Sequence, residues 1–366
     1  MKSYNHLFEK LVDNDNVSLA IKESARGKHD RITVQFTLSD MDKSIHYYQR
    51  IASCYKNANH KPREIYDGIR HKKRKIIVPM YHEQVMHHMV VNVLKPIMLK
   101  GMYEHSYGSI PNKGAFLAKK YIEKWIANDI KNTRYCLQLD VQKFFDSIPH
   151  DVLKEKLSNL IHDNRFLKVL FEIIDVQATG LPLGFYTSQW LANYYLTDLD
   201  HCIKEKFCAK YYVRYMDDMV VFGSSRKKLL RMKEQIESEL NKIGLNTKQS
   251  WKLFKIGYVD NDGNRKGNAL DFMGFKFYRE KTTLRKSIMI RMTRVARRIR
   301  DKAKATIHDC RRMLSYLGWI IATDTYNMYL KWIKPYINFQ NLKRRIGRFD
   351  RRQLCGKNQT MTICQA

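Results

Sequence analysis

Residues 211–223 read YYVRYMDDMVVFG, and this stretch decides the fold. Two arms rich in aromatic and β-branched residues flank a pair of adjacent carboxylates, which predicts a β-hairpin with Asp217 and Asp218 at its turn. Upstream, residues 136–140 read CLQLD and predict a short buried strand that ends on Asp140. The sequence therefore predicts three carboxylates at the ends of neighbouring strands.

These carboxylates have a chemical interpretation and a plain one. Carboxylates projected from neighbouring strand ends can hold two divalent cations ~3.5–4 Å apart, where the cations stabilise the attacking and leaving oxygens of an in-line displacement. Hard oxygen ligands favour Mg²⁺, which also binds substrate phosphates. Taken alone, an Asp-Asp pair is more often an ordinary turn, because Asp is favoured there. The second strand-end carboxylate, Asp140, and the charge of the whole chain favour the catalytic interpretation.

The charge points to a polyanionic partner. The 366 residues include 67 Lys and Arg against 36 Asp and Glu, which gives a formal net charge of +31. This excess is more than solubility requires, and it favours nucleic acid over a membrane surface. Hydrophobic residues make up 44% of the chain, enough for a substantial core, and the length suggests two or three domains or subdomains.

Cysteine usage and hydropathy favour a cytoplasmic protein. The 7 cysteines are scattered and form no Cys-x-x-Cys pair, which argues against a disulfide framework or a zinc ribbon. Acidic residues near the N-terminus stand where a signal peptide needs an apolar run. No stretch approaches ~20 uninterrupted apolar residues, so we expect no membrane partner.

Hydrophobic periodicity predicts helices mixed with short strands. Helices are expected over most of residues 1–60 and over 81–100, 152–174, 187–205 and 224–243, with strands at 76–79 and 136–140 and strand pairs at 211–223 and 270–278. Residues 279–352 hold 21 basic and 5 acidic residues and predict basic helices, whereas residues 353–366 predict a disordered tail.

Four segments together resemble a known family. Residues 137–153 (LQLDVQKFFDSIPHDVL), 180–200 (GLPLGFYTSQWLANYYLTDLD), 213–223 and 270–278 (LDFMGFKFY) look like the successive palm motifs of bacterial reverse transcriptases. Lys72-x-Arg74-x-Ile76 and SYGS at residues 106–109 resemble the fingers motifs that precede them. The motifs are most similar to those of diversity-generating retroelement reverse transcriptases and of related group II intron-like or phage-defence enzymes.

The resemblance implies a fold and a domain order. The fold would be α+β, a right-hand polymerase with an antiparallel-sheet palm, helical fingers and a basic helical thumb. Residues 1–59 would form an N-terminal helical extension, 60–135 the fingers, 136–278 the palm with an interleaved fingers segment at about 151–180, and 279–352 the thumb.

The resemblance also implies a metal site. Asp140 and Asp217 would be the principal catalytic metal ligands, Asp218 would support them, and the backbone of Val141 would face the metal. The cofactor would be Mg²⁺, as two ions, for which Mn²⁺ can substitute. The activity implied is RNA-directed DNA polymerisation, a nucleotidyl transfer.

Six residues are placed at the nucleotide by the same resemblance, namely Lys72, Arg74, Phe145, Leu183, Gly184 and Gln189. The two cations would grip the triphosphate, although a dense basic run can also be a solvated face. Phe145 stands where the family has an aromatic ring that excludes a ribose 2′-OH, and one ring of the Phe144–Phe145 pair is expected in the core. Leu183 departs from the Pro-Gln-Gly of retroviral enzymes and cannot make the hydrogen bond of that Gln.

Two further positions follow from the resemblance. Lys248 lies near the place where related polymerases have a general acid for pyrophosphate. Phe272, Met273 and Gly274 resemble the primer grip, a hairpin in which Gly lets the backbone approach the primer end.

The implied partners are an RNA template, a DNA primer or cDNA, and dNTPs, together with a noncoding RNA and an accessory protein. A cognate structured RNA in a retroelement or an antiphage defence system would be the natural template. The alternative is an RNA-binding maturase-type protein in which the polymerase fold mainly holds intron RNA. The intact carboxylates at Asp140, Asp217 and Asp218 argue against a purely binding role.

Overall fold

The computed structural model describes residues 3–67, 72–302 and 305–363, and the chain divides into two compact units. The first unit runs to Ala118 and resumes at Ile130–Phe254, and the second comprises Lys119–Asp129 and the chain from Lys255 onward. Residues 255–278, which the sequence assigned to the palm, thus fall in the same unit as the basic helices. The boundaries of fingers, palm and thumb stay a prediction.

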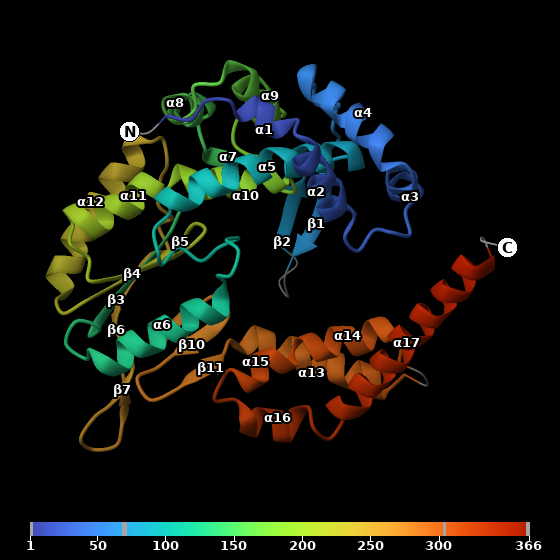
Figure 1. The fold of residues 1–366 in the computed structure, drawn as a ribbon. Coiled ribbons are helices and arrows are strands. Elements are labelled where there is room, and N and C mark those ends of the chain that lie inside the picture. Colours follow the sequence, from blue (N-terminus) through green and yellow to red (C-terminus); the bar gives the residue numbers. More distant parts are fainter. Residues whose placement is uncertain (1–2, 68–71, 303–304, 364–366) are drawn as a thin grey trace. The chain divides into compact units, whose positions relative to one another are not determined.

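The first unit contains a four-stranded sheet (Figure 1). Its strands are β3 (Tyr135–Asp140), β4 (Tyr211–Tyr215), β5 (Asp218–Gly223) and β6 (Lys252–Lys255), in the order β4-β5-β3-β6. Strand β5 pairs antiparallel with both β3 and β4, and its register sets Asp140 opposite Asp218. The predicted strand at 136–140 and the hairpin at 211–223 are therefore confirmed.

Helices complete the first unit around a buried core. They are α1 (Leu7–Leu11), α2 (Asn14–Ala25), α3 (Ile32–Ser39), α4 (Met41–Ser53), α5 (Tyr81–Gly101), α7 (Phe144–Ser147), α8 (His150–Leu160), α9 (Asn164–Ile174), α10 (Tyr186–Tyr195), α11 (Thr197–His201) and α12 (Arg226–Lys242). Helix α5 packs against α2 and α10, and α12 packs against β5 and β3. The helices predicted at 81–100 and 224–243 are confirmed.

Two predicted helices are interrupted. The segment 152–174 divides into α8, which ends at Leu160, and α9, which Asp163 caps. Its Oδ1 accepts hydrogen bonds from the backbone N–H groups of Arg165 and Phe166, both at 3.1 Å. An Asp at this position satisfies N–H groups that have no partner within the helix. The segment 187–205 divides into α10, α11 and a π-helical turn at Cys202–Lys206.

The basic run near residue 72 is itself a strand. Strand β2 (Lys72–Ile76) pairs antiparallel with β1 (Arg63–Asp67), so the strand expected at 76–79 lies earlier than predicted. Exposed side chains at Lys73, Arg74 and Lys75 explain the error, because a solvated hairpin shows no apolar periodicity.

The second unit holds short strands and basic helices. It contains most of α6 (Ala115–Asn128), the pair β7 (Tyr258–Val259) and β8 (Arg265–Lys266), a sheet of β9 (Leu270–Phe272), β10 (Phe275–Phe277) and β11 (Thr282–Leu284), and the helices α13 (Lys286–Arg300), α14 (Ile307–Ser315), α15 (Leu317–Ile321), α16 (Tyr326–Trp332) and α17 (Phe339–Ile363). The predicted strand pair at 270–278 is confirmed.

Two features of this unit differ from expectation. Strand β11 lies inside the segment predicted to be wholly helical. Helix α17 continues to Ile363 and enters the predicted tail, where no proline interrupts the backbone pattern.

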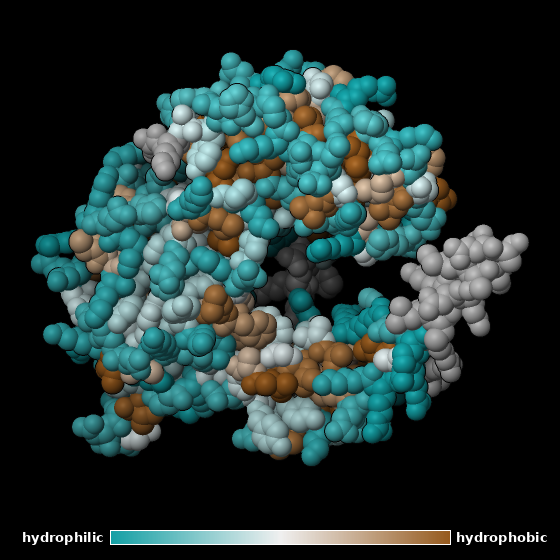
Figure 2. Space-filling view, in the orientation of Figure 1, coloured by the Kyte–Doolittle hydropathy of each residue, from teal (hydrophilic) through white to brown (hydrophobic). Residues whose placement is uncertain are grey.

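The surface of the molecule agrees with its charge. Hydrophilic residues cover most of the face shown in Figure 2. Among the described helices, none is both long enough and apolar enough to cross a membrane.

Candidate active site

A cavity of about 1230 Å³ opens in the first unit beside the ends of β3 and β5. It is lined by Lys73, Arg74, Lys75, Asp140, Gln142, Lys143, Phe144, Phe145, Asp146, Leu183, Asp217, Asp218, Lys248, Gln249 and Ser250. The three predicted carboxylates therefore share one cavity with cationic side chains. Acidic and basic groups in one hollow suit a substrate that carries both phosphates and metal ions.

The sheet register brings the carboxylates together. Asp140 is the last residue of β3 and lies opposite Asp218, the first residue of β5, while Asp217 lies in the connection between β4 and β5. Burial is the main cause that raises the pKa of Asp217 to about 7, and the negative charges of Asp140 and Asp218 raise it further. Three carboxyl groups this close resist carrying three charges without a cation.

The charge of Asp140 is met in part by Lys248. The Lys248 ammonium forms an ion pair with Asp140 Oδ2, and the Lys248 backbone N–H donates to the Asp140 carbonyl at 2.7 Å. Val141 is fully buried and bridges to Thr247, so the segment that carries Lys248 runs beside the end of β3. The structure thus places Lys248 in the cavity, next to Asp140.

These residues fit a hard divalent cation. Asp140 Oδ1 is buried and has no hydrogen-bond partner among the described residues, so one carboxylate oxygen is left for a ligand. Burial and, after it, the neighbouring carboxylates raise the pKa of Asp217, and a bound cation would offset both by stabilising the ionised carboxylate. Within the described part of the chain, no group of three or more His, Cys, Asp or Glu side chains already has the arrangement of a formed metal site.

The two adjacent phenylalanines have different environments. Phe144 is only 3% exposed and belongs to the core, whereas Phe145 is partly exposed. Lys143, with φ of 45°, turns the chain sharply before the pair. The Phe145 carbonyl accepts a hydrogen bond from Leu181 N–H at 2.6 Å, which fixes the backbone that carries the ring. Phe144 is therefore the core ring of the pair, and sugar selection by Phe145 stays a prediction.

The loop before α10 and the first turns of that helix hold three predicted residues, of which one lines the cavity. Leu183 lines it, whereas Gly184 and Gln189 are not among the lining residues. The backbone explains why this position is Gly. The φ of Gly184 is +116°, and an added Cβ would clash with the Ile77 carbonyl oxygen. The Ile77 N–H donates to the Leu183 carbonyl at 2.8 Å, so this Gly allows two segments to meet.

The basic wall of the cavity comes from β2. Arg74 lines it as predicted, and the side chain of Lys72 lies outside the described residues. Sequence reasoning missed Lys73, Lys75 and Lys143, although the density of the basic run was a signal for the first two. It also missed the polar side chains at Gln142, Gln249 and Ser250.

The predicted primer-grip residues form a tight turn in the second unit. Met273 and Gly274 connect β9 and β10 with φ of 51° and 90°. A Cβ at Gly274 would lie 2.7 Å from Ile288 Cδ1, so Gly lets α13 pack against the turn. Contact of Phe272, Met273 and Gly274 with a primer stays a prediction.

Several known proteins are similar to this chain. It is 24% identical to the protein YkfC of Escherichia coli over 148 residues, which are 37% of this chain and 39% of that protein. It is 25% identical to the retron Ec73 reverse transcriptase of Escherichia coli over 136 residues, 34% of this chain and 43% of that protein. The chain thus spans less than half the length of either relative.

An intron protein and a solved structure are also similar. The chain is 30% identical over 131 residues to an uncharacterised 91 kDa protein in the cob intron of Schizosaccharomyces pombe, which are 32% of this chain and 16% of that protein. A structure of telomerase from Candida albicans, in complex with a TWJ fragment of telomeric RNA, has a TM-score of 0.46 at 13% identity and covers 80% of this chain and 58% of that chain.

A family model settles the assignment. The model described as reverse transcriptase (RNA-dependent DNA polymerase) matches residues 59–277, which is more than half of the chain. The match contains all three carboxylates and the antiparallel sheet that holds them, so the predicted α+β polymerase fold is confirmed. The chain belongs to the reverse transcriptase family.

Proposed function

We propose that this chain synthesises DNA on an RNA template by nucleotidyl transfer. The observation that carries the proposal is the convergence of Asp140, Asp217 and Asp218 in one cavity with the basic strand β2, in a member of the reverse transcriptase family. Asp140 and Asp217, supported by Asp218 and the Val141 backbone, would hold two Mg²⁺ ions, for which Mn²⁺ can substitute. When bound, these ions stabilise the attacking and leaving oxygens of the displacement.

The remaining residues of the cavity bind and orient the nucleotide. Arg74 and its neighbours Lys73 and Lys75 attract the triphosphate and compensate the charge that develops on its oxygens. Phe145 presents a ring on the wall of the cavity, where it excludes a 2′-OH. Lys248 lies on Asp140 and is positioned to donate a proton to the leaving pyrophosphate.

The setting we propose is a retroelement or an antiphage defence system in which a cognate structured RNA is the template. The net charge of +31 supports binding to a long polyanion. The similarity to a retron reverse transcriptase supports a retroelement setting. Under this proposal the substrates are a DNA primer or cDNA and dNTPs, and an accessory protein can assist.

One assay separates synthesis from RNA binding alone. We expect the full chain to incorporate labelled dTTP on a poly(rA)·oligo(dT) duplex with Mg²⁺ or Mn²⁺, and to lose incorporation in Asp140→Asn. A gel-shift assay with the same duplex supplies the control for folding and binding. Tight binding without incorporation by the wild type would reject the proposal and favour a maturase-type role.

A further inference from the structure

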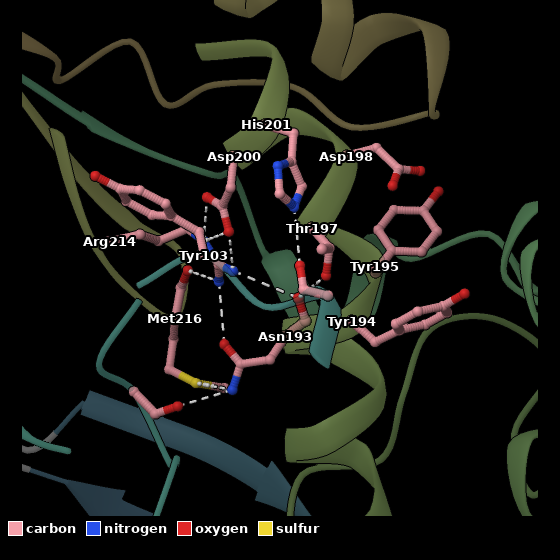
Figure 3. A network of polar contacts seen from close by, with 12 residues as sticks. Tyr103, Asn193, Tyr194, Tyr195, Thr197, Asp198, Asp200, His201, Arg214 and Met216 are labelled. Carbon is pink, nitrogen blue, oxygen red and sulfur yellow. Dashed lines mark hydrogen bonds and ion pairs between the residues drawn. The ribbon is translucent and has the colours of Figure 1, made fainter. Parts of the chain in front are cut away.

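A buried polar network, drawn in Figure 3, contacts Met216, the residue immediately before Asp217. Arg214 and Asp200 are both 0% exposed, and Asn193 is 1% exposed. They come from β4, α11 and α10, respectively, whereas the three carboxylates of the cavity lie on β3, on β5 and between β4 and β5. Burial of a full ion pair costs free energy unless every donor and acceptor is satisfied. The presence of this buried pair therefore calls for a structural or functional explanation.

The guanidinium of Arg214 is completely saturated. Its Nε donates to Asp200 Oδ1 at 2.8 Å, and Nη2 donates to Asp200 Oδ2 at 2.6 Å. The second Nη2 hydrogen is directed at the Asn193 carbonyl, at 3.4 Å. Nη1 donates to Asn193 Oδ1 and to the Met216 carbonyl, each at 3.0 Å. An Arg has five N–H groups in a planar fork, and all five are used here.

Met216 is the residue that this fork reaches, and its backbone is unusual. Its φ is 55°, in the left-handed region that an unbranched L-residue rarely adopts. It is the residue immediately before Asp217, so its carbonyl belongs to the peptide bond that leads into the metal-binding carboxylate. A non-Gly residue keeps such a conformation only where its surroundings over-determine it.

Asn193 holds the same residue from the side. Its Nδ2 donates to the Gly108 carbonyl at 2.7 Å and to Met216 Sδ at 3.4 Å. Arg214 fixes which end of the amide is the acceptor, because Arg can only donate to it. Figure 3 shows the Asn193 side chain between Arg214 and Met216.

Gly108 also packs against Met216, and its contacts with those of Arg214 and Asn193 form what we call the Met216 cradle. A Cβ at this position would lie 2.5 Å from Met216 Cγ and 2.7 Å from Met216 N. The segment is anchored to β4, since Tyr107 N–H donates to the Arg214 carbonyl at 2.9 Å and Arg214 N–H donates to the His105 carbonyl at 3.1 Å. The position therefore needs Gly because of what Met216 occupies, and not because of its own φ.

We propose that Arg214, Asn193 and Asp200 are positioning residues that hold Met216 in its left-handed conformation and thereby aim Asp217 at the metal site. Asp200 orients the fork, Arg214 holds the Met216 carbonyl, and Asn193 holds the Met216 sulfur and the Gly108 backbone. The consequence for metal binding rests on the metal site of the proposed function, and the consequence for catalysis rests on its polymerase activity as well. A network that served only stability would have no effect on the carboxylate geometry.

Two substitutions disturb the cradle from different sides and leave the buried ion pair in place. Asn193→Ala removes the hydrogen bonds of the Asn193 amide with Arg214, the Gly108 carbonyl and the Met216 sulfur, and leaves the bond from Arg214 to the Met216 carbonyl. Gly108→Ala drives a methyl group into Met216. Gly101→Ala is the matched control for the second, because its Cβ would meet only Thr197 Cγ2, at an ordinary 4.0 Å. Leu157→Ala, in the core of α8, is a control for reduced stability alone.

The experiment measures three quantities in each full-length variant. Mn²⁺ affinity is followed by electron paramagnetic resonance, the free energy of unfolding by urea titration, and RNA-templated extension by single-turnover kinetics. We expect Asn193→Ala and Gly108→Ala to weaken Mn²⁺ binding and slow extension by about 10- to 100-fold, since small misplacements of reacting groups have effects of this size. Duplex affinity should stay unchanged. In the double variant, the losses of Mn²⁺ affinity and extension rate should be smaller than the sum of the two single effects.

The outcomes separate the inference from the proposed function. If Asn193→Ala is destabilised like Leu157→Ala yet binds Mn²⁺ like the wild type, the network is structural and the inference is wrong. Equal effects of Gly108→Ala and Gly101→Ala would also overturn it. A wild type that binds Mn²⁺ but does not extend a primer would reject the proposed function, and the ratio of Mn²⁺ affinities would still decide the inference. A wild type that binds no Mn²⁺ would overturn both.

Discussion

At the scale of single residues, Asp217 connects the fold to the chemistry. Burial and two neighbouring carboxylates raise its pKa to about 7, so in the metal-free protein it still holds a proton at mildly acid pH. A metal ion binds the ionised carboxylate and must displace that proton. The residue that anchors the proposed metal site is thus also the residue whose charge responds to neutral pH.

This charge state predicts a pH-dependent metal affinity. Because the folded-state pKa is raised, the proton is retained below about pH 7 and competes with the metal there. We expect Mn²⁺ affinity to fall about tenfold for each pH unit below 7 and to level off above it, as for displacement of one proton. Titrations from about pH 5.5 to 8.5 measure it, with Asp217→Asn as the variant that lacks this proton. An affinity that is flat across this range would show that Asp217 titrates near its ordinary value.

The partly exposed ring of Phe145 gives a second prediction at this scale. Phe145→Ala should lower the preference for dNTPs over rNTPs by at least about tenfold, because the wall that excludes a 2′-OH is removed. Phe144→Ala is the matched control, since that ring lies in the core and its removal should reduce stability by about 3–5 kcal/mol without changing sugar selection. Competition between labelled dTTP and UTP measures the preference. Loss of selectivity in Phe144→Ala instead would assign the role to the other ring.

At the scale of elements, the exposed face of α13 is the strongest candidate for binding phosphates outside the cavity. Its apolar face is buried through Met292, Val295 and Ile299, while Arg291, Arg294 and Arg298 lie on the polar side of the helix. These three arginines have the i, i+3, i+7 spacing of one helical face. Helix α13 therefore has a row of exposed arginines along its polar face.

Removal of this row should change how salt affects duplex binding. In the triple variant of Arg291, Arg294 and Arg298 to Gln, the slope of log affinity against log salt should become shallower by about 0.9 for each duplex phosphate that the arginines no longer neutralise. The matched control replaces three cations at the start of α12, namely Arg226, Lys227 and Lys228. Filter binding between about 50 and 300 mM salt measures both. Equal slopes in the two variants would show that α13 is an ordinary solvated surface.

The elements also show what could and could not be predicted from sequence. The carboxylate strands were predictable because the pattern around Asp140 and Asp217 is local. The break between α8 and α9 has a sequence signal, the N-cap residue Asp163, but the hydrophobic periodicity continues across it. The hydrogen bonds of Arg214 with Asp200 and Asn193 could not be predicted, because they join three elements through side chains with no sequence spacing of their own. The same holds for the phenylalanine pair, whose environments depend on how the chain turns just before it.

At the scale of the whole molecule, the family assignment and the charge agree. The match to the reverse transcriptase model covers residues 59–277, which include the sheet, the cavity and the turn that Arg214 supports. The second unit is basic, with further cations along its helices. The proposed metal-binding centre and the strongly cationic chain together suit RNA-templated synthesis.

The most direct test of this account is single-turnover primer extension on an RNA template by the wild type and by Asp217→Asn, with duplex affinity measured in the same samples. We expect extension by the wild type and a decrease of at least about 100-fold in the variant, the scale on which one group that stabilises a transition state acts, with duplex affinity nearly unchanged. Extension at a near-wild-type rate by Asp217→Asn would contradict the assignment of these carboxylates as the catalytic centre.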